Sequence, residues 1–269
     1  MKAGSSGIIR VAIAACGLLP SLALAAYPVA LCSGEAVFPG LDARVLGHIP
    51  YAEAPASDLV PAPPGFGIGV ACTVQRDVLP DLTRLLAAAA ATPGVGQRLR
   101  AVSCFRSIAH QRAVFCSQIG PNRKCRDAAE RARSVGPPGY SEHATGYAID
   151  FGVRPSPACP DVDTCIASTV PGLWLLQHAR DYGFELSFPA GNGQGVTWEP
   201  WHWRWVGSTV ATPGAVKARL TFGRARGDFP ARPGIYDVSD YWLIPPRGII
   251  APPVTPPATA PYITLPPTP

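Results

Sequence analysis

The chain has 269 residues, of which 47% are apolar and 15% charged, and its formal net charge is +5. This composition can bury a sizeable core and fits one large domain, or one domain with extensions. The weak positive balance gives no electrostatic argument for a nucleic-acid partner, and we expect none.

Residues 1–25 are expected to be a secretory signal peptide. Lys2 and Arg10 supply its charged region, residues 11–24 are apolar, and Ala23-Leu24-Ala25 is a small-x-small cleavage site. The stretch ending at Cys16 also loosely resembles a lipoprotein signal, which would anchor the protein through Cys16. Too few apolar residues lie between Arg10 and Cys16 for such a signal, which favours cleavage after Ala25 instead. No later apolar run reaches the ~18 residues that span a membrane. We expect an exported protein, periplasmic or extracellular, without stable membrane insertion after cleavage.

The cysteines suit an oxidising compartment, where disulfides persist. Removal of the signal peptide leaves seven of the eight cysteines, an odd number. Cys159 and Cys165 flank a short loop and are expected to pair, and Cys116 and Cys125 are expected to close the basic loop between them. The sequence leaves open which residues form the third bond, for which three compete: Cys32, Cys72 and Cys104.

Composition divides the rest of the chain into three parts. Residues 26–70 are rich in Pro and Gly and predict an irregular wrap, residues 71–244 form the domain that carries the candidate site, and the Pro-rich tail at 245–269 favours disorder. The mixed charges at 123–133 indicate a solvated helix face. Periodicity and helix breakers predict helices at 77–92, 108–118, 173–182 (ending at Gly183) and 214–220, and strands at 99–105, 147–153 and 203–206.

Two short stretches carry the candidate chemistry: residues 141–150 (SEHATGYAID) and residues 198–204 (WEPWHWR). Two imidazoles and one carboxylate, from His143, Asp150 and His202, form a ligand set that leaves a fourth Zn²⁺ position open for water. Glu199 lies three residues before His202, close enough to act on that water as a general base. Neither the His143–Asp150 pair nor the Glu199–His202 pair is strong evidence alone, because histidines and acids also fill ordinary hydrogen-bonding roles.

Tryptophans surround the second stretch. Trp198, Trp201, Trp203 and Trp205 are four of the six in the chain. Alternate residues of a strand face opposite sides, so two of these indoles are expected to be core. An apolar wall beside Glu199 would raise the pKa of its carboxyl group, which suits a general base.

The combined pattern, Ser141-x-His143-x-x-Gly146-x-Ala148-x-Asp150 followed by Glu199-Pro200-Trp201-His202, resembles the VanY-type zinc D-alanyl-D-alanine carboxypeptidases of the hedgehog/D,D-peptidase (LAS) superfamily. Residues 103–107 (SCFRS), with Gln111 after them, resemble an upstream segment of that family. The likeness covers about residues 45–207.

The resemblance implies an α+β fold in which a small antiparallel sheet carries the site and helices pack on it. It implies His143, Asp150 and His202 as Zn²⁺ ligands, Glu199 as the base, and Arg106 as the cation facing the oxyanion or the substrate carboxylate. Three further residues are expected to bind substrate: Ser141, Gln111 and Trp201.

The activity implied is removal of the terminal D-Ala from peptidoglycan stem peptides, the expected partner, by attack of a zinc-bound water. L,D-carboxypeptidase and endopeptidase activities stay open as alternatives, as does a non-catalytic cell-wall binding module. Two departures from the family bear on the choice: Ser187-Phe188-Pro189 replaces an Arg-Tyr-Pro common in relatives, and Cys104 replaces the usual glycine. The sequence does not indicate the oligomeric state.

Overall fold

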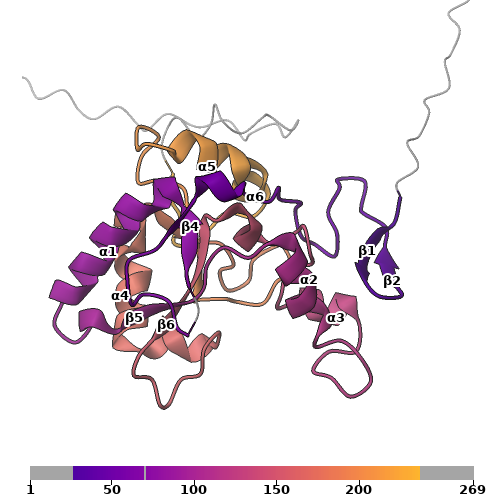
Figure 1. Ribbon diagram of the computed structural model, residues 1–269, viewed down its shortest axis with the longest axis horizontal. Coiled ribbons are helices and arrows are strands. Elements are labelled where there is room, and N and C mark those ends of the chain that lie inside the picture. Colours follow the sequence, from indigo (N-terminus) through magenta and orange to yellow (C-terminus); the bar gives the residue numbers. More distant parts are fainter. Residues whose placement is uncertain (1–26, 70, 237–269) are drawn as a thin grey trace, which may run out of the picture.

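The computed structural model describes residues 27–69 and 71–236 (Figure 1). The expected signal peptide at 1–25 and the Pro-rich tail at 245–269 lie outside these residues. Within the described part of the chain, no helix has both the length and the apolarity needed to cross a membrane.

A four-stranded antiparallel sheet lies at the centre of the molecule. Its strands are β5 (Leu99–Ser103), β6 (Ala148–Val153), β8 (His202–Trp205) and β7 (Phe184–Leu186), in that spatial order. All residues of β6, β7 and β8 are buried, because these strands are covered on both faces. The fold is therefore α+β with a small antiparallel sheet, as expected, although β7 had no counterpart among the predicted strands.

The main core packs helices against this sheet. It includes residues of α1 (Leu79–Ala91), α4 (Val170–His178), α5 (Ala215–Thr221) and α6 (Gly223–Asp228). In α1, Leu82, Leu85 and Ala89 share one face and are 0–1% exposed. Burial of each such leucine contributes roughly 1.5–3 kcal/mol.

Trp203 and Trp205 are the two core indoles of β8, both 0% exposed. They alternate with Arg204 and so point to the same face of the strand. The Nε1 group of Trp205 donates a 2.9 Å hydrogen bond to Asp81 in the first turn of α1. This bond satisfies a buried polar atom and ties α1 to the strand that carries His202.

The predicted helices are confirmed with changed bounds: α1 and α2 (Ile108–Cys116) are shorter, and α4 is shorter and begins three residues earlier. The α4 helix ends at His178 and continues as a 3-10 turn, Ala179–Tyr182, before Gly183 closes the element with a φ of 82°. A β-carbon at Gly183 would lie 2.8 Å from the Cα atom of Gly207, so glycine is needed there for both conformation and space.

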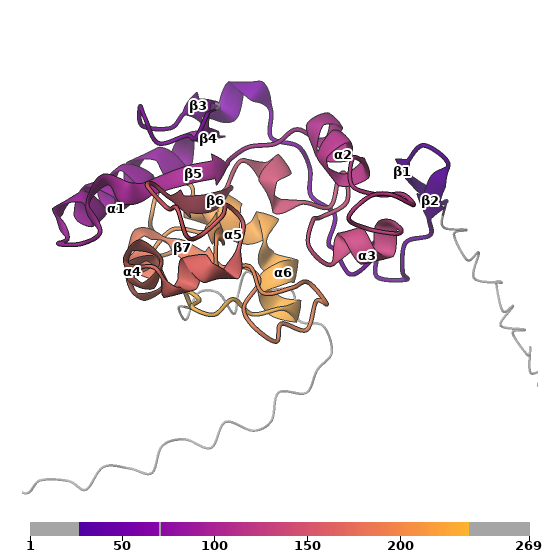
Figure 2. The same ribbon diagram turned by 90° about the horizontal axis from the view of Figure 1, so that it is seen from below.

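A second, smaller core lies at one end of the molecule, away from α1 and α4 (Figure 2). It joins the hairpin of β1 (Val29–Cys32) and β2 (Glu35–Val37) to α2 (Ile108–Cys116) and α3 (Ala128–Ala132). The buried side chains of this core are Leu31, Val45, Phe115, Ala128 and Ala132.

The disulfides correct one prediction. Cys159–Cys165 forms as expected, but Cys116 pairs with Cys32, and Cys125 is a buried free thiol. The end of α2 packs against β1, whereas backbone hydrogen bonds between residues 118 and 125 already close the loop that a Cys116–Cys125 bond was expected to close. The remaining bond joins Cys72 to Cys104.

The N-terminal segment is largely irregular, with short strands. β3 (Leu59–Pro61) pairs with β4 (Thr73–Gln75) across the predicted boundary at residue 70. The charged residues of the 123–133 stretch are mostly exposed. Arg131 is the exception among them: it is 7% exposed, and its guanidinium donates to the backbone oxygens of Phe115 and Val114. The domain bounds themselves stay predictions.

Candidate active site

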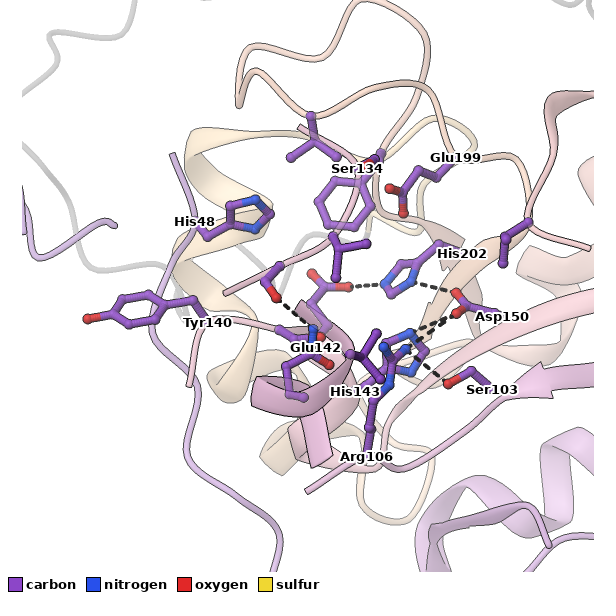
Figure 3. Close-up of a pocket in the computed structure, with 18 of the residues that line it drawn as sticks. His48, Ser103, Arg106, Ser134, Tyr140, Glu142, His143, Asp150, Glu199 and His202 are labelled. Atoms are coloured by element: carbon purple, nitrogen blue, oxygen red, sulfur yellow. Dashed lines mark hydrogen bonds and ion pairs between the residues drawn. The ribbon is translucent and has the colours of Figure 1, made fainter. Parts of the chain in front are cut away.

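Strand register places two of the expected ligands side by side. Asp150 in β6 and His202, the first residue of β8, are direct cross-strand partners. His143 comes from a 3-10 turn, Glu142–Thr145, that immediately precedes β6. Gly146 ends this turn with a φ of 72°, in the left-handed region that glycine adopts without strain. The backbone therefore delivers all three side chains to one place (Figure 3).

The three side chains converge on one point. Nε2 of His143 lies 3.0 Å from Oδ2 of Asp150, and Nδ1 of His202 lies 2.9 Å from Oδ1 of the same carboxylate. One ligand atom from each residue lies within 4.8 Å of the others. All three side chains are buried.

Hydrogen bonds at the far ring nitrogens determine which nitrogen of each histidine faces Asp150. Nδ1 of His143 lies 2.8 Å from the backbone oxygen of Cys104, and Nε2 of His202 lies 3.0 Å from a carboxylate oxygen of Glu142. Each far nitrogen must donate to its oxygen, which leaves the near nitrogen free to bind a metal through its lone pair. Two imidazole nitrogens and a carboxylate in this arrangement fit a Zn²⁺ site with an open position.

The charges of the cluster favour a cation. Burial alone would raise the pKa of Asp150, but His143 and His202 hold it well below its usual range. Burial alone would lower the pKa of His202, but hydrogen bonds to Asp150 and Glu142 raise it. The raised pKa of His202 favours protonation of both ring nitrogens in the metal-free protein, so metal binding would be coupled to release of the Nδ1 proton.

Glu199 lies in the turn that leads into β8, and its carboxyl group faces the cavity beside His202 (Figure 3). Its backbone N–H donates to Phe188, and its backbone oxygen accepts from the N–H of His202, both at 3.0 Å. The side chain is buried, and burial raises the pKa of the Glu199 carboxyl group to about 8. This shift has the direction expected for a buried acid, and the negative charges of Asp150 and Glu142 add to it.

Arg106 follows β5 and lies on the other side of the cluster. Its Nη2 atom donates to Oγ of Ser103 at 3.0 Å and lies 3.7 Å from Oδ2 of Asp150. Its backbone N–H also donates to the backbone oxygen of His143. The guanidinium is thus fixed next to the candidate metal position.

All eight residues expected at the site line a single cavity of about 560 Å³. Ser141 is 7% exposed, and Trp201 is half-buried in the cavity wall. The Nε2 atom of Gln111 donates to the backbone oxygen of Gly136 at 2.6 Å, while its buried Oε1 atom has no hydrogen-bond partner among the described residues. A buried acceptor without a donor carries a cost in free energy, so this oxygen would gain from a donor that reaches it.

Sequence reasoning missed Glu142, which is 4% exposed. Its carboxylate accepts from Nε2 of His202, from Oγ of Ser187 at 2.6 Å and from Nη1 of Arg204 at 2.8 Å. Burial alone would raise the pKa of Glu142, but Arg204 and His202 keep it below its usual range. Its place directly before His143, inside the first motif, was the signal available in the sequence.

The chain matches the VanY family, D-alanyl-D-alanine carboxypeptidase, over residues 72–208, about half of its length. It belongs to that family. The resemblance of the two motifs to VanY-type enzymes is thereby confirmed.

Several relatives are similar to this chain. YodJ of Bacillus subtilis (strain 168) is 35% identical over 121 residues, which are 43% of this chain and 41%, less than half, of that relative. The bifunctional D-Ala-D-Ala dipeptidase and D-Ala-D-Ala carboxypeptidase VanXYC of Enterococcus gallinarum is 29% identical over 140 residues, covering 50% of this chain and 67% of that protein. The solved structure of the LdcB LD-carboxypeptidase is 26% identical, with a TM-score of 0.51, and covers 65% of this chain and 81% of that one.

Proposed function

We propose that this protein is a zinc-dependent D-alanyl-D-alanine carboxypeptidase that removes the terminal D-Ala from peptidoglycan stem peptides. The observation that carries the proposal is one cavity that holds a convergent, buried His–Asp–His set, a carboxyl group of raised pKa and a fixed guanidinium. Membership of the VanY family supports it. The three disulfides support action outside the cytoplasm, where such bonds persist.

His143, Asp150 and His202 would hold the metal, and a bound Zn²⁺ would supply Lewis acidity to the scissile carbonyl and to the attacking water. Glu199 accepts the proton of that water and returns it to the leaving amine. Its raised pKa makes the protonated form accessible near neutral pH, which the second transfer requires.

Arg106 stabilises negative charge on the substrate. Its guanidinium is directed toward the cavity by Ser103 and by the attraction of Asp150. A planar fork donor that keeps its charge suits the developing oxyanion or the terminal carboxylate. Gln111, Ser141 and Trp201 line the same cavity and would contact the rest of the peptide.

A second candidate is L,D-carboxypeptidase activity, which one substitution and one relative favour. Ser187 stands where many VanY-type enzymes carry arginine, and its hydroxyl donates to Glu142 instead of contributing a cation. The LdcB structure, named as an LD-carboxypeptidase, is similar in fold to this chain. An endopeptidase acting on cross-linked stems is a variant of the same proposal.

Product analysis on three peptidoglycan fragments separates these activities. Stem pentapeptide, stem tetrapeptide and cross-linked dimer are each incubated with the zinc-loaded protein, and the products are resolved by mass. Loss of one D-Ala from the pentapeptide alone supports the D,D-carboxypeptidase. Cleavage of the tetrapeptide or the dimer in its place would move the assignment to the second candidate, and binding without cleavage would indicate a cell-wall binding module.

A further inference from the structure

A chain of buried ionic contacts begins at His202 and leaves the cavity. Nε2 of His202 contacts Oε2 of Glu142 at 3.0 Å, and Oε1 of Glu142 contacts Nη1 of Arg204 at 2.8 Å. Nε of Arg204 then contacts Oε1 of Glu185 at 2.8 Å, and Nε of Arg226 contacts the same oxygen at 3.1 Å. Only Glu142 touches His202 directly, and the four charged residues of this chain of contacts form the buried charge relay: Glu142, Arg204, Glu185 and Arg226.

The relay is balanced in charge and buried. Its two acids and two arginines are each at most 4% exposed. Buried charges persist only where opposite charges and hydrogen bonds compensate them, so each member depends on its neighbours. Removal of one member leaves the next without a partner.

Each carboxylate oxygen of Glu142 has a separate task. Arg204 holds Oε1, while Oε2 accepts from His202 and from Ser187. The Arg204 guanidinium is itself fixed over the ring of Phe222, at 5.3 Å from the ring centre. Glu142 therefore has little freedom to rotate away from the imidazole. Figure 3 shows Glu142 and Asp150 on opposite sides of His202.

The relay extends beyond the segment that matches the family. Residues 72–208 include Glu142, Glu185 and Arg204, but Arg226 lies in α6. Arg226 also donates to the backbone oxygen of Ile235, whose N–H donates to Oε2 of Glu185 at 3.2 Å. The α6 helix and the chain after it thus complete the environment of Glu185, an acid three contacts away from His202.

We propose that Glu142 is a positioning residue for the metal ligand His202, and that the relay through Arg204 and Glu185 to α6 holds it in place. The inference rests on the proposed function, because it takes His202 as a ligand. Glu142 fixes the plane of the ring and keeps a proton on Nε2, so that the lone pair of Nδ1 points at the metal. A carboxylate behind a ligating histidine also makes that histidine a stronger ligand.

Zinc affinity measured by chelator competition tests this role without using activity. Glu142→Gln keeps the size of the side chain and removes its charge, and it should weaken Zn²⁺ binding about 10- to 100-fold. Glu185→Gln acts two contacts further away than Glu142 and should weaken zinc binding about two- to thirtyfold, the size of effect seen along coupled networks.

Asp81→Asn is the matched control. Asp81 is also a buried acid bonded to β8, through Trp205, but none of its hydrogen bonds or ion pairs joins it to the relay. We expect it to lower the melting temperature and to leave zinc affinity within about twofold of wild type, since it does not touch a ligand. Wild-type affinity in Glu142→Gln, or an equal loss in Asp81→Asn, would overturn the proposal, and wild-type affinity in Glu185→Gln would overturn its relay part.

A measurement on the unmodified protein covers the case in which Glu142→Gln does not fold. In ¹⁵N-histidine NMR of the zinc-loaded chain, His202 should carry its proton on Nε2, as a slowly exchanging hydrogen-bonded N–H. His143 should carry its proton on Nδ1, because that atom donates to Cys104. A proton on Nδ1 of His202 would overturn the role of Glu142, whereas a wild-type chain that binds no zinc would overturn this inference and the proposed function together.

Discussion

Replacement of Glu199 by glutamine should make the metal-free protein more stable at alkaline pH while abolishing its activity. Burial raises the pKa of the Glu199 carboxyl group from an ordinary value of 4.5 to about 8. Between these two values the folded state binds more protons at this group than the unfolded state. The free energy of unfolding of the wild type therefore falls as pH rises between these two pKa values. Glutamine does not ionise, so Glu199→Gln does not lose stability in this way.

The size of the effect follows from the shift in pKa. At about 1.4 kcal/mol per pKa unit, ionisation of Glu199 lowers the free energy of unfolding by roughly 4 kcal/mol between pH 5 and pH 8.5, as an upper bound. Glu199→Gln should thus gain on the wild type by up to this amount over the same range. Buried catalytic acids commonly oppose stability in this way.

Urea unfolding with chelator present, at a series of pH values from 5 to 8.5, measures this difference. Subtraction of the wild-type curve from the variant curve cancels groups that titrate alike in both proteins. Added zinc should shrink the difference, because a neighbouring cation favours the ionised carboxylate. A difference that stays flat with pH, or that falls as pH rises, would refute the assignment of a buried, proton-retaining Glu199.

Three further predictions concern the surroundings of the site. Arg106→Ala should lower kcat about 10²- to 10³-fold with zinc stoichiometry unchanged, and a larger loss of zinc than of turnover would contradict its role. Cys32→Ser/Cys116→Ser should lower the free energy of unfolding in urea by about 2–5 kcal/mol, because that bond links segments 84 residues apart; unchanged stability would argue against the pairing. Gly146→Ala should destabilise the fold by about 1–3 kcal/mol, because of its positive φ and a β-carbon 2.8 Å from Leu59; Gly34→Ala, with a φ of 75° and open space, should cost less, and equal costs would assign the effect to φ alone.

The sequence predicted those parts of the molecule that depend on local pattern. Helical spacing marked α1, and the residues of β6 and β8 could be read as strands. The candidate ligands and base were found because each lies in a short motif on or beside one of those strands. These side chains converge because the register between β6 and β8 pairs Asp150 with His202.

Long-range pairings could not be predicted in this way. Glu142 and Arg204 are 62 residues apart, and no local periodicity indicates that their charges meet in the core. The Cys32–Cys116 bond depends on the packing of the N-terminal hairpin against α2, which the sequence does not specify. The three-residue β7 strand is too short to give a periodic signal.

Release of free D-alanine from a stem pentapeptide, in the presence of chelator and again after zinc is restored, tests the central claim most directly. The proposed zinc D,D-carboxypeptidase should lose D-alanine release with chelator and regain it with zinc, and Glu199→Gln should bind one zinc per chain without releasing D-alanine. Release that persists in chelator, or wild-type release by Glu199→Gln, would contradict the account.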